Sequence, residues 1–120
     1  MDKAQAIHTF WSGFGLPAYD ENTVPDNAPL PYITYGVQTA SIDETVYPSA
    51  SIWYRGKSWE AISKKADEIY EAIKRAPQTQ KVDGGRMFIT PGTPFAQRMS
   101  DEDDSIRRIL IQVNIEFFTN

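Results

Sequence analysis

The sequence contains no cysteine and a single histidine, His8. Without cysteine, neither disulfide bonds nor thiolate chemistry is available, and nothing indicates a secreted, oxidising setting. A lone histidine needs partners to act in catalysis or to hold a metal, so we expect His8 to be a surface or packing residue. The motifs GxSxG, HExxH and GxGxxG are missing, and no Ser–His–acid set is visible. We therefore predict that the protein is not an enzyme and uses neither a cofactor nor a metal.

Long apolar runs and an excess of positive charge are also missing. No run approaches the roughly 20 residues that cross a membrane, and the first residues, MDKAQAIHTFW, do not resemble a signal peptide. A net charge of −4 disfavours non-specific binding to nucleic acid. We expect no membrane partner and no direct nucleic-acid partner. The length of 120 residues suits one domain, residues 1–120.

The clearest pattern in the chain lies between residues 58 and 76 and is helical. Apolar residues recur there at steps of three and four, which places them on one stripe of a helix. They are Trp59, Ile62, Ala66, Ile69, Tyr70, Ile73 and Ala76. Ser58 can cap the first turn, and Glu60–Lys64 and Glu71–Arg75 are favourable i,i+4 pairs. A helix with a single apolar stripe needs a sheet to lie on.

Alternating apolar and polar residues predict strands at 31–39, 45–55, 86–90 and 105–118. In the last and longest of these, the residues predicted to face the main helix are Ile109, Ile111, Val113, Ile115 and Phe117. Prolines at 91 and 94 break the third strand, which resumes irregularly at 95–99. Residues 2–14 read as a short first helix. The expected fold is α+β: an antiparallel sheet of about four strands, with a main amphipathic helix and a short N-terminal helix on one face.

The segments between these elements read as loops. Residues 16–30 form a long, proline-rich arm that packs either on the body of the subunit or on a neighbouring subunit. Residues 78–85 read as a polar turn, because their Gly-Gly pair lacks the Lys-Ser/Thr ending of a phosphate loop. Four adjacent carboxylates, Asp101, Glu102, Asp103 and Asp104, could hold a hard cation. They lack the spacing of a calcium loop, so a solvated hairpin tip is the expected structure.

Three runs of the sequence resemble a known family: PYITYGVQ, then SIWYRGKSW before the main helix, and RRILIQVNIEFF at the last strand. Over roughly residues 29–118 the chain resembles the small tail-terminator proteins (tail-completion or minor tail proteins) of long-tailed bacteriophages and prophages. The resemblance implies a structural protein that forms a hexameric ring, which ends the tail tube and prepares it for joining to the head. It implies copies of itself, the tail-tube protein and the head–tail connector as partners. It also implies a place in the virion tail, and in the bacterial host cytoplasm during assembly.

Several residues are candidates for contacts between subunits in such a ring. Trp53, Arg55 and Arg108 lie on the outward sides of the predicted strands, and aromatic residues and arginine are enriched at interface centres. The acidic residues Asp101, Glu102, Asp103 and Asp104, together with the basic Arg107 and Arg108, give one subunit both signs of charge for a head-to-tail contact. Two other functions stay open: a head–tail connector or neck protein of similar fold, and a small-molecule enzyme on an α+β sandwich.

Overall fold

A computed structural model describes residues 1–39, 44–75 and 78–119. Its helical elements are α1 (Lys3–Trp11), the short 3-10 helix η1 (Ser12–Phe14) and α2 (Glu60–Arg75). Its strands are β1 (Ala18–Asp20), β2 (Tyr32–Tyr35), β3 (Thr45–Val46), β4 (Ser49–Arg55), β5 (Gln78–Val82), β6 (Gly85–Met99) and β7 (Ile106–Thr119). Among the described residues, no helix is long and apolar enough to cross a membrane.

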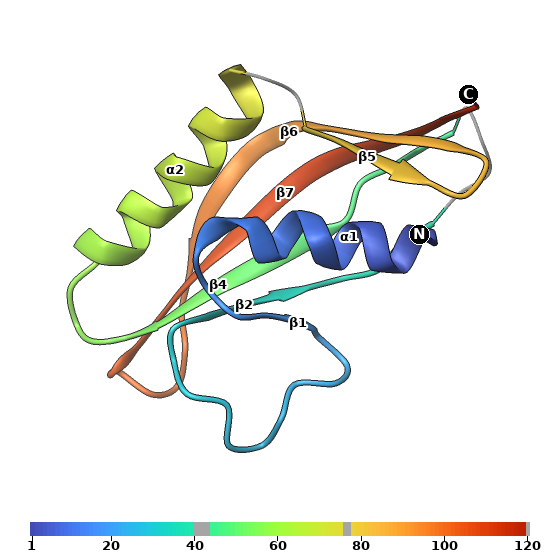
Figure 1. Ribbon diagram of the computed structural model, residues 1–120. Helices are drawn as coiled ribbons and strands as arrows, with labels where there is room; N and C mark the ends of the chain where they lie inside the picture. The colour runs from blue at the N-terminus through green and yellow to red at the C-terminus, as the bar shows by residue number, and fades with distance from the viewer. Residues whose placement is uncertain (40–43, 76–77, 120) are drawn as a thin grey trace.

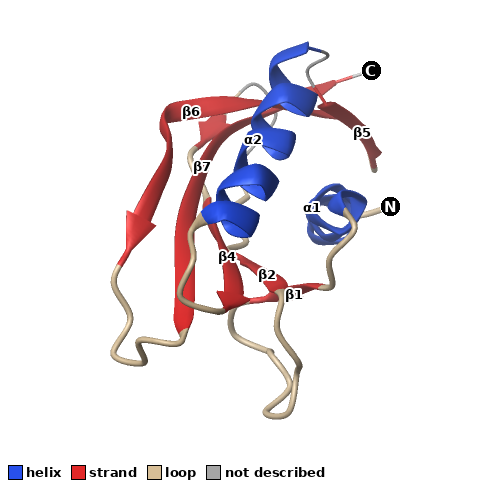
Figure 2. Ribbon diagram, turned by 90° about the vertical axis from the view of Figure 1, so that its left-hand side faces the viewer, coloured by secondary structure: helices blue, strands red, loops and turns tan. Residues whose placement is uncertain are grey.

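The strands form one seven-stranded sheet in the order β1-β2-β4-β7-β6-β5, with β3 also paired to β7 (Figure 1). The sheet is mixed, because β1 runs parallel to β2 while the other pairs are antiparallel. It curls into a half-barrel around the helices (Figure 2). The predicted antiparallel sheet of about four strands is therefore wrong in strand number, strand direction and shape.

The additional strands come from segments that the sequence analysis assigned to loops. Residues 78–85 are not a turn: β5 pairs with the start of β6, and only Asp83 and Gly84 connect the two strands. Gly84 has φ of 83°, which glycine adopts without steric cost. The strand is polar (QTQKV) because it lies at the edge of the sheet, and of its residues only Val82 is fully buried.

The predicted arm at residues 16–30 also contains a strand. Three residues of β1 pair with β2, and the Ile33 N–H donates to the Pro17 carbonyl at 2.8 Å. A run of three residues is too short to show an alternating pattern. The second predicted strand is likewise divided, because β3 ends and β4 begins on either side of Pro48, which cannot donate a ladder hydrogen bond. The segment between the first two predicted strands, residues 40–44, falls largely on residues 40–43, outside the described residues.

The prolines at 91 and 94 do not divide β6, which is continuous from Gly85 to Met99. At 15 residues it is longer than the 14-residue β7, which was predicted to be the longest strand. Instead the register shifts: Pro91 is opposite Val113, and Ala96 is opposite Ile111. Between these two pairs the chain advances five residues along β6 but only two residues along β7, which is a bulge in β6. The bulge brings the two backbones close at Gly92, where an added Cβ would lie 2.8 Å from the Gln112 carbonyl oxygen. Only glycine fits this approach without a shift of backbone.

Replacing Gly92 with Ala should therefore destabilise the protein by about 1–3 kcal/mol, the usual cost of forcing extra volume into a packed site. Gly13 is the matched control, because an added Cβ there meets nothing within 4 Å. Denaturant unfolding of both variants measures the difference. Equal stability of Gly92→Ala and Gly13→Ala would contradict the close approach.

Both helices lie on the concave side of the sheet (Figure 2). The predicted stripe of α2 is buried at Ile62, Ala66, Ile69 and Ile73, whereas Trp59 and Tyr70 are half-buried at its margin. The Ser58 hydroxyl accepts the Glu60 N–H at 3.1 Å. Both predicted ion pairs form, at 3.4 Å for Glu60–Lys64 and 3.8 Å for Glu71–Arg75. The residues predicted to face inward on the last strand are all buried, which confirms their direction. They do not all face α2, because the centre of the Phe117 ring lies 4.5 Å from the ammonium group of Lys3 in α1.

The first helix, α1, lies beside α2 on the concave side of the sheet (Figure 2). A capping box formed by Asp2 and Gln5 starts α1, and its buried face consists of Ala6, Ile7, Phe10 and Trp11. Lys65 links the two helical segments, because its ammonium group donates to the Phe14 carbonyl at 2.7 Å and pairs with Glu68 at 3.1 Å. The two helices and the inner face of the sheet thus share one core.

Candidate functional site

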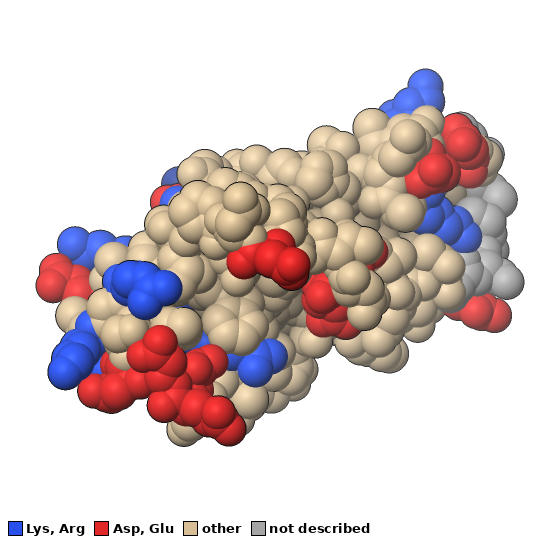
Figure 3. All heavy atoms as spheres, turned by 90° about the horizontal axis from the view of Figure 1, so that it is seen from below, with Lys and Arg blue, Asp and Glu red and all other residues tan. Residues whose placement is uncertain are grey.

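The residues predicted to lie at a subunit interface come together at one end of the elongated molecule. At this end β4 finishes, β6 finishes and β7 begins, and residues 100–105 connect the last two strands. Arg55 is opposite Ile106, and Trp53 is opposite Arg108, across the β4–β7 ladder. Figure 3 shows acidic side chains crowded beside basic ones at the left-hand end of the view. Strand register, not sequence proximity, brings Trp53 and Arg108 together.

Trp53 and Arg108 lie on the convex face of the sheet, and both are half-buried. The Arg108 guanidinium is 4.7 Å from the centre of the indole ring, a cation–π distance. Trp53 Nε1 donates to Thr34 Oγ1 at 2.9 Å, and Arg108 Nε donates to Ser51 Oγ at 3.0 Å. Both hydroxyls are buried beneath the two large side chains. We call Trp53 and Arg108, with the hydroxyls that hold them, the outer platform.

A second arginine–aromatic cluster lies on the concave side of the same end. Trp59, at the start of α2, has Arg98 at 4.7 Å and Arg107 at 5.3 Å from its ring centre. Arg107 also donates to the carbonyls of Lys57 and Asp104, at 3.1 and 2.8 Å. From the sequence, Trp59 was expected to serve core or interface packing, and Arg98 was not selected. The cluster depends on β6 resuming its pairing with β7 after the bulge, at Ala96–Met99. The sequence predicted a resumption at 95–99, but not the register that brings Arg98 to Trp59.

The acidic segment is folded as an ordered turn. Asp101 Oδ1 accepts the Asp103 N–H at 2.9 Å, and Asp103 Oδ1 accepts the N–H and hydroxyl of Ser105 at 2.9 and 2.7 Å. The Ser105 hydroxyl and N–H lower the pKa of Asp103 below its ordinary value. Asp104 pairs with Lys57 at 3.6 Å and with Arg107 at 3.8 Å. Within the described ranges, no group of three or more potential ligands is arranged to hold a metal ion.

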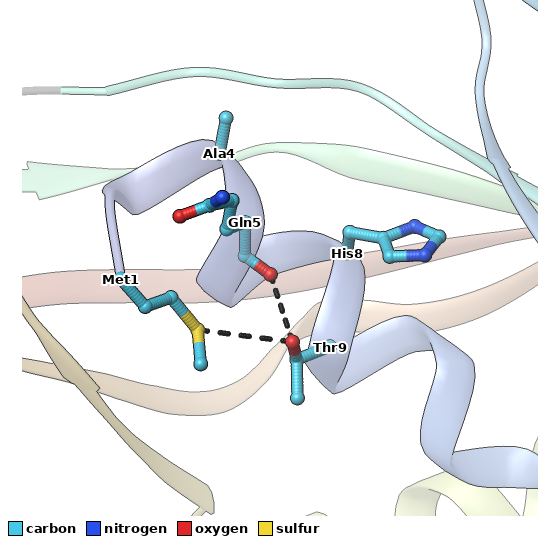
Figure 4. A pocket seen from close by; sticks show the side chains of 5 residues that line it. All are labelled: Met1, Ala4, Gln5, His8 and Thr9. Atoms are coloured by element: carbon cyan, nitrogen blue, oxygen red, sulfur yellow. Dashed lines mark hydrogen bonds between the residues drawn. The ribbon is translucent and has the colours of Figure 1, made fainter.

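A shallow surface hollow of about 560 Å³ lies along the exposed side of α1, lined by Met1, Ala4, Gln5, His8 and Thr9 (Figure 4). The two ring nitrogens of His8 contact the Tyr35 hydroxyl at 2.9 Å and the Ser12 hydroxyl at 3.3 Å. This order resembles a serine–histidine pair with its orienting group. However, the orienting group is a phenol, which is neutral near pH 7, and burial and the charge of Asp20 raise the pKa of Tyr35 further. It cannot balance an imidazolium charge as the carboxylate of a triad does.

The fold was compared with known proteins. The chain is similar to one from the virion of a native gene transfer agent particle, with a TM-score of 0.69 and 16% sequence identity. The superposition covers 97% of this chain and 94% of that chain. No protein-family model and no curated protein sequence matches. The two chains therefore share a fold over nearly their full lengths.

Proposed function

We propose that this protein is a structural subunit of a virion of the tailed-phage type, not an enzyme. The observation that supports the proposal best is the similarity over nearly the whole of both chains to a subunit of a gene transfer agent virion. A match over part of the chain would show only a shared sheet-and-helix motif, whereas this superposition includes nearly every residue of both chains. The resemblance of the strand sequences to tail-terminator proteins indicates the same class of particle from a separate line of reasoning.

Within that class, we propose that copies of the chain form a ring, most commonly a hexamer, that ends the tail tube and prepares it for joining to the head. Its partners are then further copies, the tail-tube protein and the head–tail connector. A ring requires two different surfaces on each subunit that meet head to tail at every interface. The end of the molecule that carries the outer platform offers aromatic and arginine side chains, which are enriched at the centres of interfaces.

The protein should bind one end of purified tail tubes as a ring and stop their growth. Ring formation can be favoured on the tube, because the first bound subunits hold the later ones at high effective concentration. Negative-stain imaging of tubes grown with and without the protein, together with the sedimentation of the free protein, tests this expectation. Tubes of unchanged length that carry no added density would contradict tube termination. Binding only to the head-side connector would support the connector function instead.

The His8→Ala variant is a suitable control in that assay. If the protein is structural, tube termination should not depend on the His8 imidazole, whose contacts are the Tyr35 and Ser12 hydroxyls. If this variant failed to end tubes while its denaturant unfolding stayed unchanged, the exposed side of α1 would be part of the surface that ends tubes.

A further inference from the structure

We propose that Arg108 in the outer platform binds a carboxylate from the acidic turn, residues 101–104, of a second copy of this chain. The inference rests on the proposed function only in that it requires copies of the chain to assemble. It assigns separate roles to residues that the sequence analysis could only group together: Arg108 is the receptor, and the acidic turn is its ligand.

The outer platform holds Arg108 in one orientation before any partner arrives. The hydrogen bond from Nε to Ser51 and the contact with the Trp53 ring restrain the guanidinium at two points. The indole is itself restrained by its hydrogen bond to Thr34. Ser51 and Thr34 are 4% and 9% exposed, so neither hydroxyl can readily exchange its partner for water. A restrained arginine loses little conformational entropy on binding, which favours affinity.

The rest of the guanidinium is available for a ligand. Arginine has five N–H donors in a planar fork, and the structure gives Arg108 one hydrogen bond, from Nε. Within residues 1–39, 44–75 and 78–119, Arg108 forms no ion pair, although it lies next to an acidic turn in the sequence. The terminal nitrogens match the two oxygens of a carboxylate, which arginine binds in a bidentate manner. The geometry of the outer platform thus suits an oxyanion such as a carboxylate.

The neighbouring arginines are less suited to this role. Arg107 already donates to the carbonyls of Lys57, Asp104 and Ile106 and pairs with the Asp104 carboxylate. Arg55 is exposed and donates to the Ser105 hydroxyl at 3.3 Å, without an aromatic ring beneath it. They stabilise the connection between β6 and β7, and in doing so they fix the shape of the acidic turn.

The acidic turn has the complementary charge and the right exposure. Asp104 pairs with Lys57 and Arg107, whereas Asp101 and Asp103 each use one oxygen in the turn and remain exposed side chains. The hydrogen bonds from Ser105, and to a smaller extent the charge of Arg55, lower the pKa of Asp103. Glu102 is exposed, and the described residues provide it with no ion pair. Because the whole chain carries a charge of −4, two copies repel each other unless a specific pairing overcomes the repulsion. The acidic turn of each additional copy can therefore supply the carboxylate that Arg108 binds.

A charge exchange tests the pairing. Arg108→Glu alone, and the double change Asp101→Lys with Glu102→Lys alone, should each weaken self-association about tenfold or more. Combining all three changes in one chain should restore association, because the two signs have then been exchanged. Arg86→Glu is the matched control, since it makes the same charge change at an exposed position near the start of β6, at the opposite end of the β6–β7 ladder from Arg108. Sedimentation equilibrium of the full chain, with and without tail tubes, measures association, and denaturant unfolding verifies that each variant is folded.

The outcomes separate this inference from the proposed function. Folded single variants that assemble like the unmodified chain, or a combined variant that does not recover, would overturn the pairing and leave the proposed function standing. An unmodified chain that associates neither alone nor on tubes would overturn both. Association that follows the charge exchange without any ring on the tube would support the pairing and reject tail termination.

Discussion

Replacing Ile73 with Ala should lower the free energy of unfolding by about 2–5 kcal/mol. The Ile73 side chain is fully buried where α2 lies against the concave face of the sheet, in the same core as Ile69, Ile111 and Val113. Truncation removes apolar contact and leaves a cavity, because the strands beneath are held by ladder hydrogen bonds on both sides and cannot collapse freely.

Two further variants on the same helix make the measurement specific. Ile73→Val removes one methylene and should cost about 0.5–1.5 kcal/mol. Lys74→Ala changes an exposed neighbour and should stay within about 0.5 kcal/mol of the unmodified chain. Urea unfolding followed by circular dichroism gives all three values. A loss below about 0.5 kcal/mol for Ile73→Ala would mean that the stripe of α2 is not part of the core.

The sequence predicted α2 and β7 well because each buries one side and exposes the other. In β7 the alternation from Ile109 to Phe117 fixes which residues face inward, since a shift by one residue would turn every apolar side chain outward. The stripe from Ile62 to Ile73 follows the helical period for the same reason. A strong difference between two faces leaves a strong pattern in the sequence.

The rest of the sheet could not be predicted in this way. β5 is an edge strand whose residues are mostly polar, and β1 is too short to show a period. β6 contains two prolines, and although its resumption at 95–99 was predicted, the size of the register shift at the bulge was not. The outward direction of Trp53 and Arg108 followed from alternation. Their stacking, and the cluster of Arg98 around Trp59, depend on register between strands, which a single sequence does not display.

Trp11→Ala should be more damaging still, with a loss of about 3–5 kcal/mol. Trp11 is 1% exposed and lies at the end of α1. Its ring centre is 4.7 Å from that of Phe10 and 6.4 Å from that of Phe14. This aromatic group anchors α1 and η1 in the curl of the sheet. Since a domain of this size is stable by about 5–15 kcal/mol, the substitution should remove a large share of the total and lower the unfolding midpoint steeply.

Trp53→Ala is the informative control, because it makes the same chemical change on the opposite face of the sheet. Trp53 is half-buried in the outer platform, so its loss should cost less stability than the loss of Trp11 while weakening association between copies. Unfolding followed by circular dichroism, not fluorescence, treats the two variants equally, since each lacks one indole. If both cost the same stability, the outer platform would be part of the folding core. If Trp53→Ala left association unchanged, the indole would not be what positions Arg108 for its partner.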